Sequence, residues 1–132
     1  MSKIIIVRTR FFILEVIHIR NLEERRETID SLIEFIKAGA VSREQKEIIY
    51  KIVLNMKKSD LQKRRFCMIY SFGPNIDEKN TYKKVAAFYD CSISNIRGSV
   101  MSIVAGFIRL PDEQFNVLKR IVEDCKLKNE TK

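Results

Sequence analysis

Glycine and proline are scarce in this chain, with 4 glycines and 2 prolines among its 132 residues. A sequence so poor in the two residues that interrupt helices and strands does not describe a loop-rich or disordered protein. Hydrophobic residues make up 45% of the chain, which is enough for one modest core. The length fits a single domain, or one domain with a small appendage. We therefore expect a folded chain made mostly of regular elements.

Cysteine and histidine, which most often hold metals or act in nucleophilic catalysis, are also few. Cys67, Cys91 and Cys125 are odd in number, far apart and without a CxxC pair. This spacing argues against a disulfide framework or a zinc site and favours reduced core thiols. His18, the single histidine, lies in an apolar alternating stretch. A glycine-rich phosphate loop and a paired-carboxylate site are missing from the sequence as well. We expect no enzymatic activity, no catalytic residue, no metal and no cofactor.

Long uninterrupted apolar runs are missing too. The first twenty residues are rich in apolar side chains, but Arg8, Arg10, Glu15 and His18 interrupt them. Their longest clean run, Ile4 to Val7, is far too short to span a bilayer. No small-residue cleavage site follows, so we expect neither a signal peptide nor a membrane partner. The expected location is the cytoplasm.

Positive charge is in excess. Lysine and arginine number 25 against 17 aspartate and glutamate residues, which gives a formal net charge of +8. Such a balance favours a polyanionic partner, either nucleic acid or an acidic membrane surface. It indicates the kind of partner and says nothing about the fold.

Hydrophobic periodicity separates the N-terminal stretch from the rest of the chain. The letters "EVIHIR" alternate as a strand would, so a strand or hairpin is expected there, with a helix left open. After Leu22, apolar residues recur at the spacing of an amphipathic helix. They are Ile29, Leu32, Ile33 and Ile36. Gly39 follows them and suits a left-handed helix cap.

Serine and threonine mark the starts of further helices. "SREQ" at Ser42 and "SDLQ" at Ser59 have the capping-box pattern. The helix after Ser59 should end at "FGPN", because glycine and proline both break helices. Thr81 and Ser92 can cap two short helices, and Pro111 suits the first position of the last one. The sequence predicts a mostly α protein with six helices, in which a short β segment could form at the N-terminus.

The stretch "VAAFYDCSISNIRGSV" meets the physical requirements of a DNA-reading helix pair. Such a pair needs a short first helix, a tight turn and a second helix whose first turns present small or polar groups. Ala86 lets the helices approach closely, "DC" makes the turn, and Val85, Ile96 and Val100 can pack between the helices. The alternative is a purely structural helical hairpin.

Nine residues are expected to contact DNA on this reading. Asparagine can pair with adenine and arginine with guanine or phosphate, while lysines and helix-capping residues suit phosphates. The predicted DNA-binding residues are Thr81, Lys83, Lys84, Ser92, Ile93, Ser94, Asn95, Arg97 and Met101. Other basic residues near the pair could add phosphate contacts; they are Lys63, Arg64, Arg65, Lys79 and Arg109.

Residues 60–110 resemble region 4 of the bacterial sigma-70 family. The family has a Leu-rich helix with an Arg-Phe-Gly-like corner, then a Thr-led helix, a Val-Ser turn and a recognition helix. The matching residues here are Leu61, Phe66, Phe72, Gly73, Thr81, Val85, Ala86, Cys91, Ser92, Ile96 and Arg97. The resemblance implies a transcription regulator of a bacterium or phage that could also touch RNA polymerase. Nothing before Asp60 resembles the promoter-melting part of the family, so a region 4-like regulator is expected rather than a complete sigma factor.

The chain divides into two parts on this interpretation. Residues 1–58 would form an extended segment and helices, and residues 59–127 the helix-turn-helix domain. The first part could complete the core or form a homodimer surface, since helix-turn-helix regulators often pair. Two other functions stay open: a helical adaptor or inhibitor that binds protein without reading DNA, and a phage DNA-packaging or recombination accessory.

Overall fold

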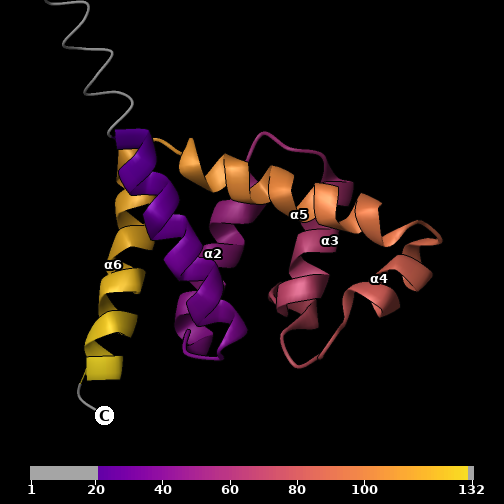
Figure 1. Ribbon diagram of the computed structural model, residues 1–132, viewed down its shortest axis with the longest axis horizontal. Helices are drawn as coiled ribbons and strands as arrows, with labels where there is room; N and C mark the ends of the chain where they lie inside the picture. Colours follow the sequence, from indigo (N-terminus) through magenta and orange to yellow (C-terminus); the bar gives the residue numbers. More distant parts are fainter. Residues whose placement is uncertain (1–20, 131–132) are drawn as a thin grey trace, which may run out of the picture.

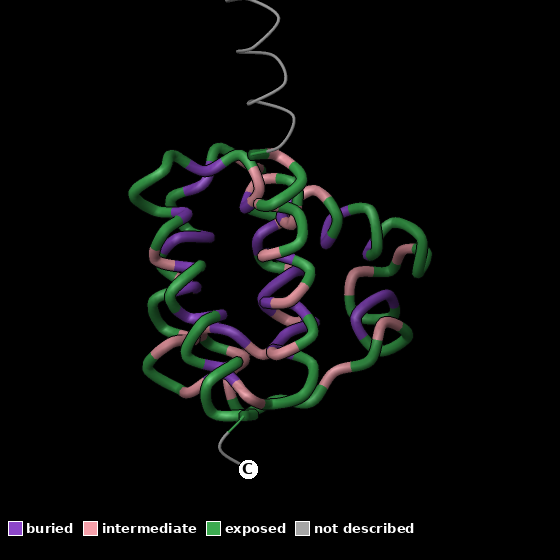
Figure 2. Tube along the Cα trace, turned by 60° about the vertical axis from the view of Figure 1, so that its left-hand side comes forward, coloured by how far each residue is buried: buried purple, intermediate pink, exposed green. Residues whose placement is uncertain are grey.

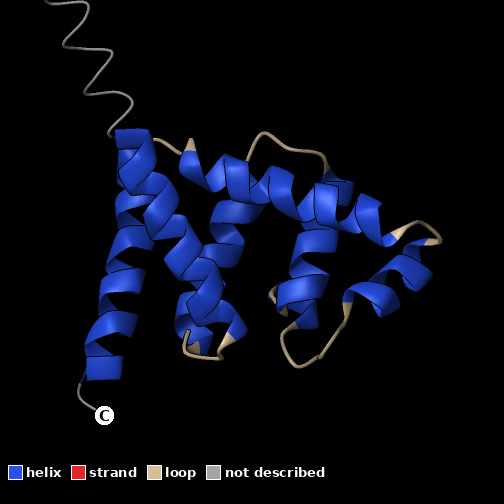
Figure 3. Cartoon of the chain, in the orientation of Figure 1, coloured by secondary structure: helices blue, strands red, loops and turns tan. Residues whose placement is uncertain are grey.

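The computed structural model describes residues 21–130, and these residues are almost entirely helical (Figure 1). The chain is helical over 21–37 and then forms α2 (Arg43–Asn55), α3 (Asp60–Tyr70), the 3-10 turn η1 (Gly73–Asn75), α4 (Tyr82–Tyr89), α5 (Ile93–Ile108) and α6 (Asp112–Glu130). No strand occurs within residues 21–130 (Figure 3). The predicted mostly α fold is confirmed, while the predicted N-terminal β segment lies outside the described residues.

Helix α5 runs across the upper part of the molecule in Figure 1. The 21–37 helix, α2 and α6 gather at the end where α5 finishes, and α3 and α4 lie at the end where it begins. Helix α3 packs closely along α5, and α4 crosses the start of α5. The buried side chains form one hydrophobic core that reaches from Ile29 to Cys125. Figure 2 shows these buried positions recurring along each helix between exposed ones.

Serine and threonine side chains begin four of the helices, as the sequence predicts. Ser42 and Gln45 form the complete capping box of α2, with bonds of 3.1 and 3.0 Å. Ser59 caps α3 by accepting a bond from the Gln62 amide, but the return bond from the Ser59 amide is not present among the described residues. The Gln62 side chain instead accepts a hydrogen bond from Ser102 on α5. The predicted capping box at Ser59 is therefore only half formed, because the side chain of Gln62 is hydrogen-bonded to Ser102 on α5.

Gly73 shapes the corner that ends α3. Its φ of +59° lies in the left-handed region that side chains disfavour. A Cβ at this position would lie 2.4 Å from the ring of Tyr50 on α2. Both the backbone conformation and the close approach of that ring therefore require glycine at the predicted helix-breaking corner.

Four aromatic rings join α3 to α5 and to the corner. Phe66 lies 5.0 Å from Tyr70, 5.8 Å from Phe72 and 5.6 Å from Phe107, measured between ring centroids. Phe66, Phe72 and Phe107 have no exposed surface. Burial also protects the nearby Cys67, where it raises the thiol pKa to about 12. Cys67 and Cys125 are free and buried, as expected for core thiols, whereas Cys91 is only half-buried.

Arg25 joins the 21–37 helix to the junction between α5 and α6. Its guanidinium donates hydrogen bonds to the carbonyl oxygens of Ile108, at 3.0 Å, and Leu110, at 2.7 Å. It also forms an ion pair with Asp112 and lies 4.5 Å from the ring centre of Phe115. The carbonyls at the end of a helix lack partners within the helix, so Arg25 supplies what the last turn of α5 needs.

Candidate nucleic-acid interface

The turn between α4 and α5 is tight and sharply bent. The two helix axes differ in direction by 104°, within the range of a helix-turn-helix. Asp90 closes α4 in the left-handed conformation, with φ at 51°. The amide of Cys91 donates to the carbonyl of Ala86, and Ser92 then caps α5. The predicted short helix, turn and second helix are all present at the predicted residues.

Small and branched apolar side chains fill the space between the two helices. Val85 and Ile96 have no exposed surface, and Ala86 and Val100 are almost completely covered. The sequence predicted that Val85, Ile96 and Val100 pack together here, and their burial agrees with that. Ser99 is also buried in this face of α5, which the sequence reading did not anticipate.

Arg65 on α3 contacts both helices of the pair. Its guanidinium donates to the hydroxyl oxygen of Ser99 at 3.1 Å and lies 5.1 Å from the ring centre of Tyr89. The Ser99 hydroxyl in turn donates to the carbonyl of Asn95. Burial raises the pKa of Tyr89, while the charges of Arg64 and Arg65 act in the opposite direction. Arg65 therefore connects α3 to both α4 and α5, and its role in the structure is internal.

Lys63 also faces inward. It is among the buried residues, and its ammonium group donates to the carbonyl of Leu54 at 2.8 Å. That carbonyl belongs to the last turn of α2, where a cation interacts favourably with the helix dipole. The charged groups of Lys63 and Arg65 are thus both hydrogen-bonded to other parts of the protein.

All nine predicted DNA-binding residues have surface that a partner could reach. Thr81, Lys83, Lys84, Ser92, Ser94, Asn95 and Arg97 are exposed, and so are Ile93 and Met101, with 38% and 70% of their surface accessible. They lie in two places: the first turn of α4 with its cap, and the outer face of α5 with its cap. Thr81 and Ser92 accept the amides of Lys84 and Asn95, so their hydroxyl protons remain able to donate to a phosphate.

Arg97 on the outer face of α5 contacts the first turn of α4. Its guanidinium lies 5.6 Å from the ring centre of Tyr82, the first residue of α4. This distance is within the range of a cation–π contact. The contact brings the charged end of Arg97 toward the same helix start that carries Lys83 and Lys84. Tyr82 was expected only as an apolar position of α4, and its ring contact with Arg97 could not be read from local spacing.

The outer face of α5 has two different rows of side chains. Residues four apart form ridges on a helix, and one such row consists of Ile93, Arg97 and Met101. The neighbouring row begins with Ser94 and Gly98. It projects less from the helix, because serine has a small side chain and glycine has none. A Cβ built on Gly98 would meet no atom within 4 Å other than those of its chain neighbours and the adjacent backbone of α5. Gly98 therefore leaves open space outside the protein and does not serve internal packing.

The charge of α5 is uniform in sign. Arg97 is the single charged residue in the sequence of the helix, which contains no aspartate or glutamate. A polyanion can therefore approach this face without meeting a carboxylate of the helix itself. The exposed lysines at the start of α4 lie beside it, which gives the pair a positively charged edge.

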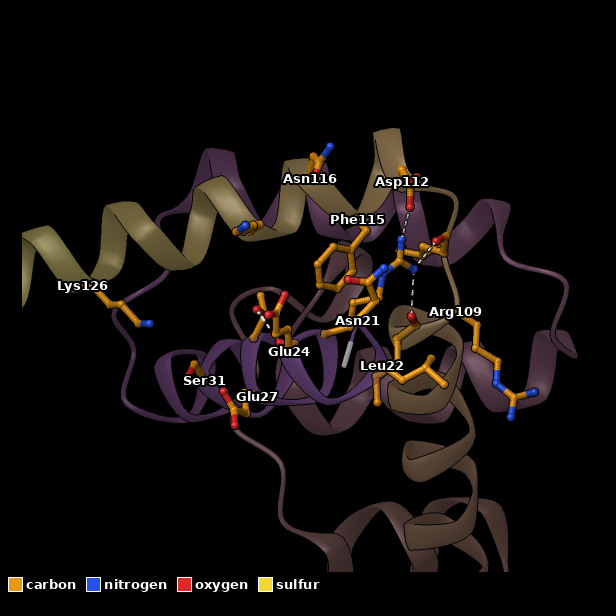
Figure 4. Close-up of a pocket in the computed structure, with 15 residues that line it drawn as sticks. Asn21, Leu22, Glu24, Glu27, Ser31, Arg109, Asp112, Phe115, Asn116 and Lys126 are labelled. Atoms are coloured by element: carbon orange, nitrogen blue, oxygen red, sulfur yellow. Dashed lines mark hydrogen bonds and ion pairs between the residues drawn. The ribbon is translucent and has the colours of Figure 1, made fainter. Parts of the chain in front are cut away.

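A second region of the surface is hollowed beside the 21–37 helix (Figure 4). The cavity has a volume of about 800 Å³ and is lined by residues of this helix, the end of α5 and α6. Arg25 is among the lining residues, where it is bound to Asp112 and to the backbone oxygen of Leu110 and lies close to Phe115. Within residues 21–130, no group of three or more His, Cys, Asp or Glu side chains is placed to hold a metal ion. Among its lining residues, Arg25 joins the 21–37 helix to the junction between α5 and α6, whereas the hydroxyl of Thr28 donates to the carbonyl of Glu24 within its own helix.

No helix within residues 21–130 is by itself long and apolar enough to cross a membrane. The bent pair of α4 and α5, taken together, has the length and composition that a membrane span requires.

Comparison of the chain with protein-family models, with curated proteins and with solved structures gives no match. The resemblance to sigma-70 region 4 accordingly stays a prediction.

Proposed function

We propose that this protein is a sequence-specific double-stranded DNA-binding regulator of transcription. The observation that carries the proposal is the outer face of α5, which is exposed, free of carboxylates and set at 104° to a short supporting helix. A recognition helix enters the major groove in this way, with the first helix of the pair across the phosphate backbone. The excess of positive charge in the chain supports the same partner.

The residues divide into two roles in this proposal. Ile93, Ser94, Asn95 and Arg97 face the base edges from the first turns of α5. Lys83, Lys84 and the two capping hydroxyls of Thr81 and Ser92 bind phosphates and fix the register of the helix on the duplex. Contact with RNA polymerase and pairing into a homodimer, which the sequence suggested, belong to the same proposal.

One observation favours a second candidate, the helical adaptor that binds another protein. Phe88 exposes 70% of its surface on α4, beside the half-buried Tyr89. Exposed aromatic side chains are common at the centres of protein interfaces. The two candidates differ in their dependence on salt, because phosphate contacts release counterions and a protein interface need not.

Selection of duplexes from a random library tests the proposal. We expect wild-type protein to enrich a motif and to lose affinity steeply as salt rises, since each neutralised phosphate contributes about −0.9 to the slope of log K against log salt. Arg97→Ala should weaken the binding or relax the motif at one position. Arg120→Ala, which removes an exposed arginine of α6, is the matched control and should leave the motif unchanged. Failure to bind any duplex would contradict the proposal of DNA binding and would favour the helical adaptor that binds another protein.

Replacing Gly98 with alanine should change stability and DNA affinity in opposite directions. The substitution should raise the free energy of unfolding by about 0.5–1 kcal/mol, because glycine is a poor helix former and the added Cβ meets open space. It should lower duplex affinity by about tenfold if the backbone of α5 lies against the base edges, a loss of ~1.4 kcal/mol. Chemical denaturation and fluorescence anisotropy measure the two quantities.

Gly106 provides the control on the same helix. A Cβ there would lie 3.0 Å from the sulfur of Met56, inside the protein. Gly106→Ala should therefore affect stability through packing and leave DNA affinity unchanged. Equal DNA affinities for wild type and Gly98→Ala would show that the backbone of α5 does not approach the duplex.

A further inference from the structure

Two large apolar side chains stand exposed on the face of α5 that is proposed to meet DNA. Met101 exposes 70% of its surface and Ile93 exposes 38%. With Arg97 between them they form one ridge at the spacing i, i+4, i+8. Neither side chain belongs to the core, since α5 buries Ile96, Ile103 and Phe107 on its other side, so both are accessible to a partner.

The charged member of this ridge is drawn away from its apolar neighbours. The guanidinium of Arg97 lies over Tyr82 at the start of α4, beside the exposed Lys83 and Lys84. From that place the guanidinium meets a base edge at the side of the groove, next to the phosphate backbone. The two apolar side chains of the ridge, Ile93 and Met101, then face the remaining floor of the groove.

Only one base offers an apolar group in the major groove, and that group is the C5-methyl of thymine. We propose that Ile93 and Met101 bind thymine methyl groups, so that the DNA target carries thymines at two contacted positions. This inference rests on the proposed function, because it requires α5 to lie in the groove. The carboxylate-free face and the flanking lysines make duplex DNA the occupant that the charges favour.

The geometry of the helix also gives the spacing of the two thymines. Ile93 and Met101 are eight residues apart, which places them about 12 Å from each other along the axis at 1.5 Å per residue. Base pairs follow at about 3.4 Å, so the contacted thymines lie roughly three to four steps apart when α5 follows the groove. Gly98 and Ser94 form the neighbouring row, which projects less from the helix, and let the helix come close enough for both contacts.

Replacement of thymine by deoxyuridine in the selected duplex tests this inference directly. Deoxyuridine keeps the base pair and removes only the methyl group. Wild-type protein should bind about fourfold more weakly for each contacted methyl that is removed, the fold-change expected for one buried methyl-sized group. Met101→Ala should bind the thymine and deoxyuridine forms equally at one position, and Ile93→Ala should do so at another. Leu127→Ala, which shortens a 60% exposed apolar side chain of α6, should discriminate as the wild type does.

Each outcome separates the inference from the function on which it rests. A loss of thymine discrimination that maps to Met101 or Ile93 supports both. An enriched motif whose affinity is the same with thymine and deoxyuridine at every position overturns the thymine contacts and leaves the DNA-binding function intact. Absence of any selected duplex overturns the function and the inference together, and would point to a protein as the occupant of this face.

Discussion

Replacing Phe66 with alanine should lower the free energy of unfolding by about 3–5 kcal/mol, the cost of removing a fully buried aromatic side chain. The ring of Phe66 contacts those of Tyr70, Phe72 and Phe107, so its loss leaves a cavity where α3, its corner and α5 meet. Because a small domain is stable by only about 5–15 kcal/mol, this single change removes a large share of the total. Urea denaturation followed by circular dichroism measures the difference.

Phe88 is the matched control for this substitution. It is a phenylalanine of the neighbouring helix α4, but 70% of its surface is exposed. Phe88→Ala should change the free energy of unfolding by less than about 1 kcal/mol, since little buried surface is lost. Similar costs for the two variants would contradict the placement of Phe66 at the centre of the core.

Reversing the charges of Lys83 and Lys84 should reduce duplex DNA affinity by about 100-fold or more at low salt, because two phosphate contacts become two repulsions. Both lysines are exposed in the first turn of α4, and neither forms an ion pair within residues 21–130 that its loss would break. The slope of log K against log salt should become shallower by about 1.8, the share of two phosphates. Fluorescence anisotropy at several salt concentrations gives both numbers for the variant Lys83→Glu/Lys84→Glu.

Lys119 and Arg120 form a comparable pair of adjacent cations, exposed on α6. Lys119→Glu/Arg120→Glu changes the net charge of the protein by the same amount and should reduce DNA affinity far less. The comparison therefore separates a localised phosphate site from general attraction between a basic protein and a polyanion. Equal losses in the two variants would mean that the start of α4 holds no phosphate.

The helices could be predicted well because their signals are local. Ser42, Thr81 and Ser92 accept amides only three residues ahead, so the sequence by itself contains both partners of each bond. The helix pair could be predicted for the same reason, since its turn and its apolar spacing lie within one short stretch. The nine candidate DNA-binding residues were chosen from that stretch, and every one has exposed surface.

Contacts between distant residues could not be predicted in this way. Lys63 and Arg65 look like members of a solvated basic run, yet their partners Leu54 and Ser99 belong to other helices. Gln62 has the correct spacing for a capping box and is taken by Ser102, which lies 40 residues away in the sequence. Charge and spacing do not reveal such partners, because burial decides which polar groups must find one. The division of the chain at residue 58 and the contact with RNA polymerase stay predictions.

The hydrogen bonds of Arg25 hold the C-terminal end of α5, so they affect the orientation of the whole helix. The helix has 16 residues and is therefore about 24 Å long, with its proposed reading end at Ile93 and its other end held by the guanidinium of Arg25. A tilt of about 5° at the held end would displace the reading end by roughly 2 Å, which is comparable to the rise of one helical residue. Hydrogen bonds to bases tolerate much less than that. The position of Ile93 relative to a duplex therefore depends partly on Arg25, which lies near the start of the described residues and outside the helix pair.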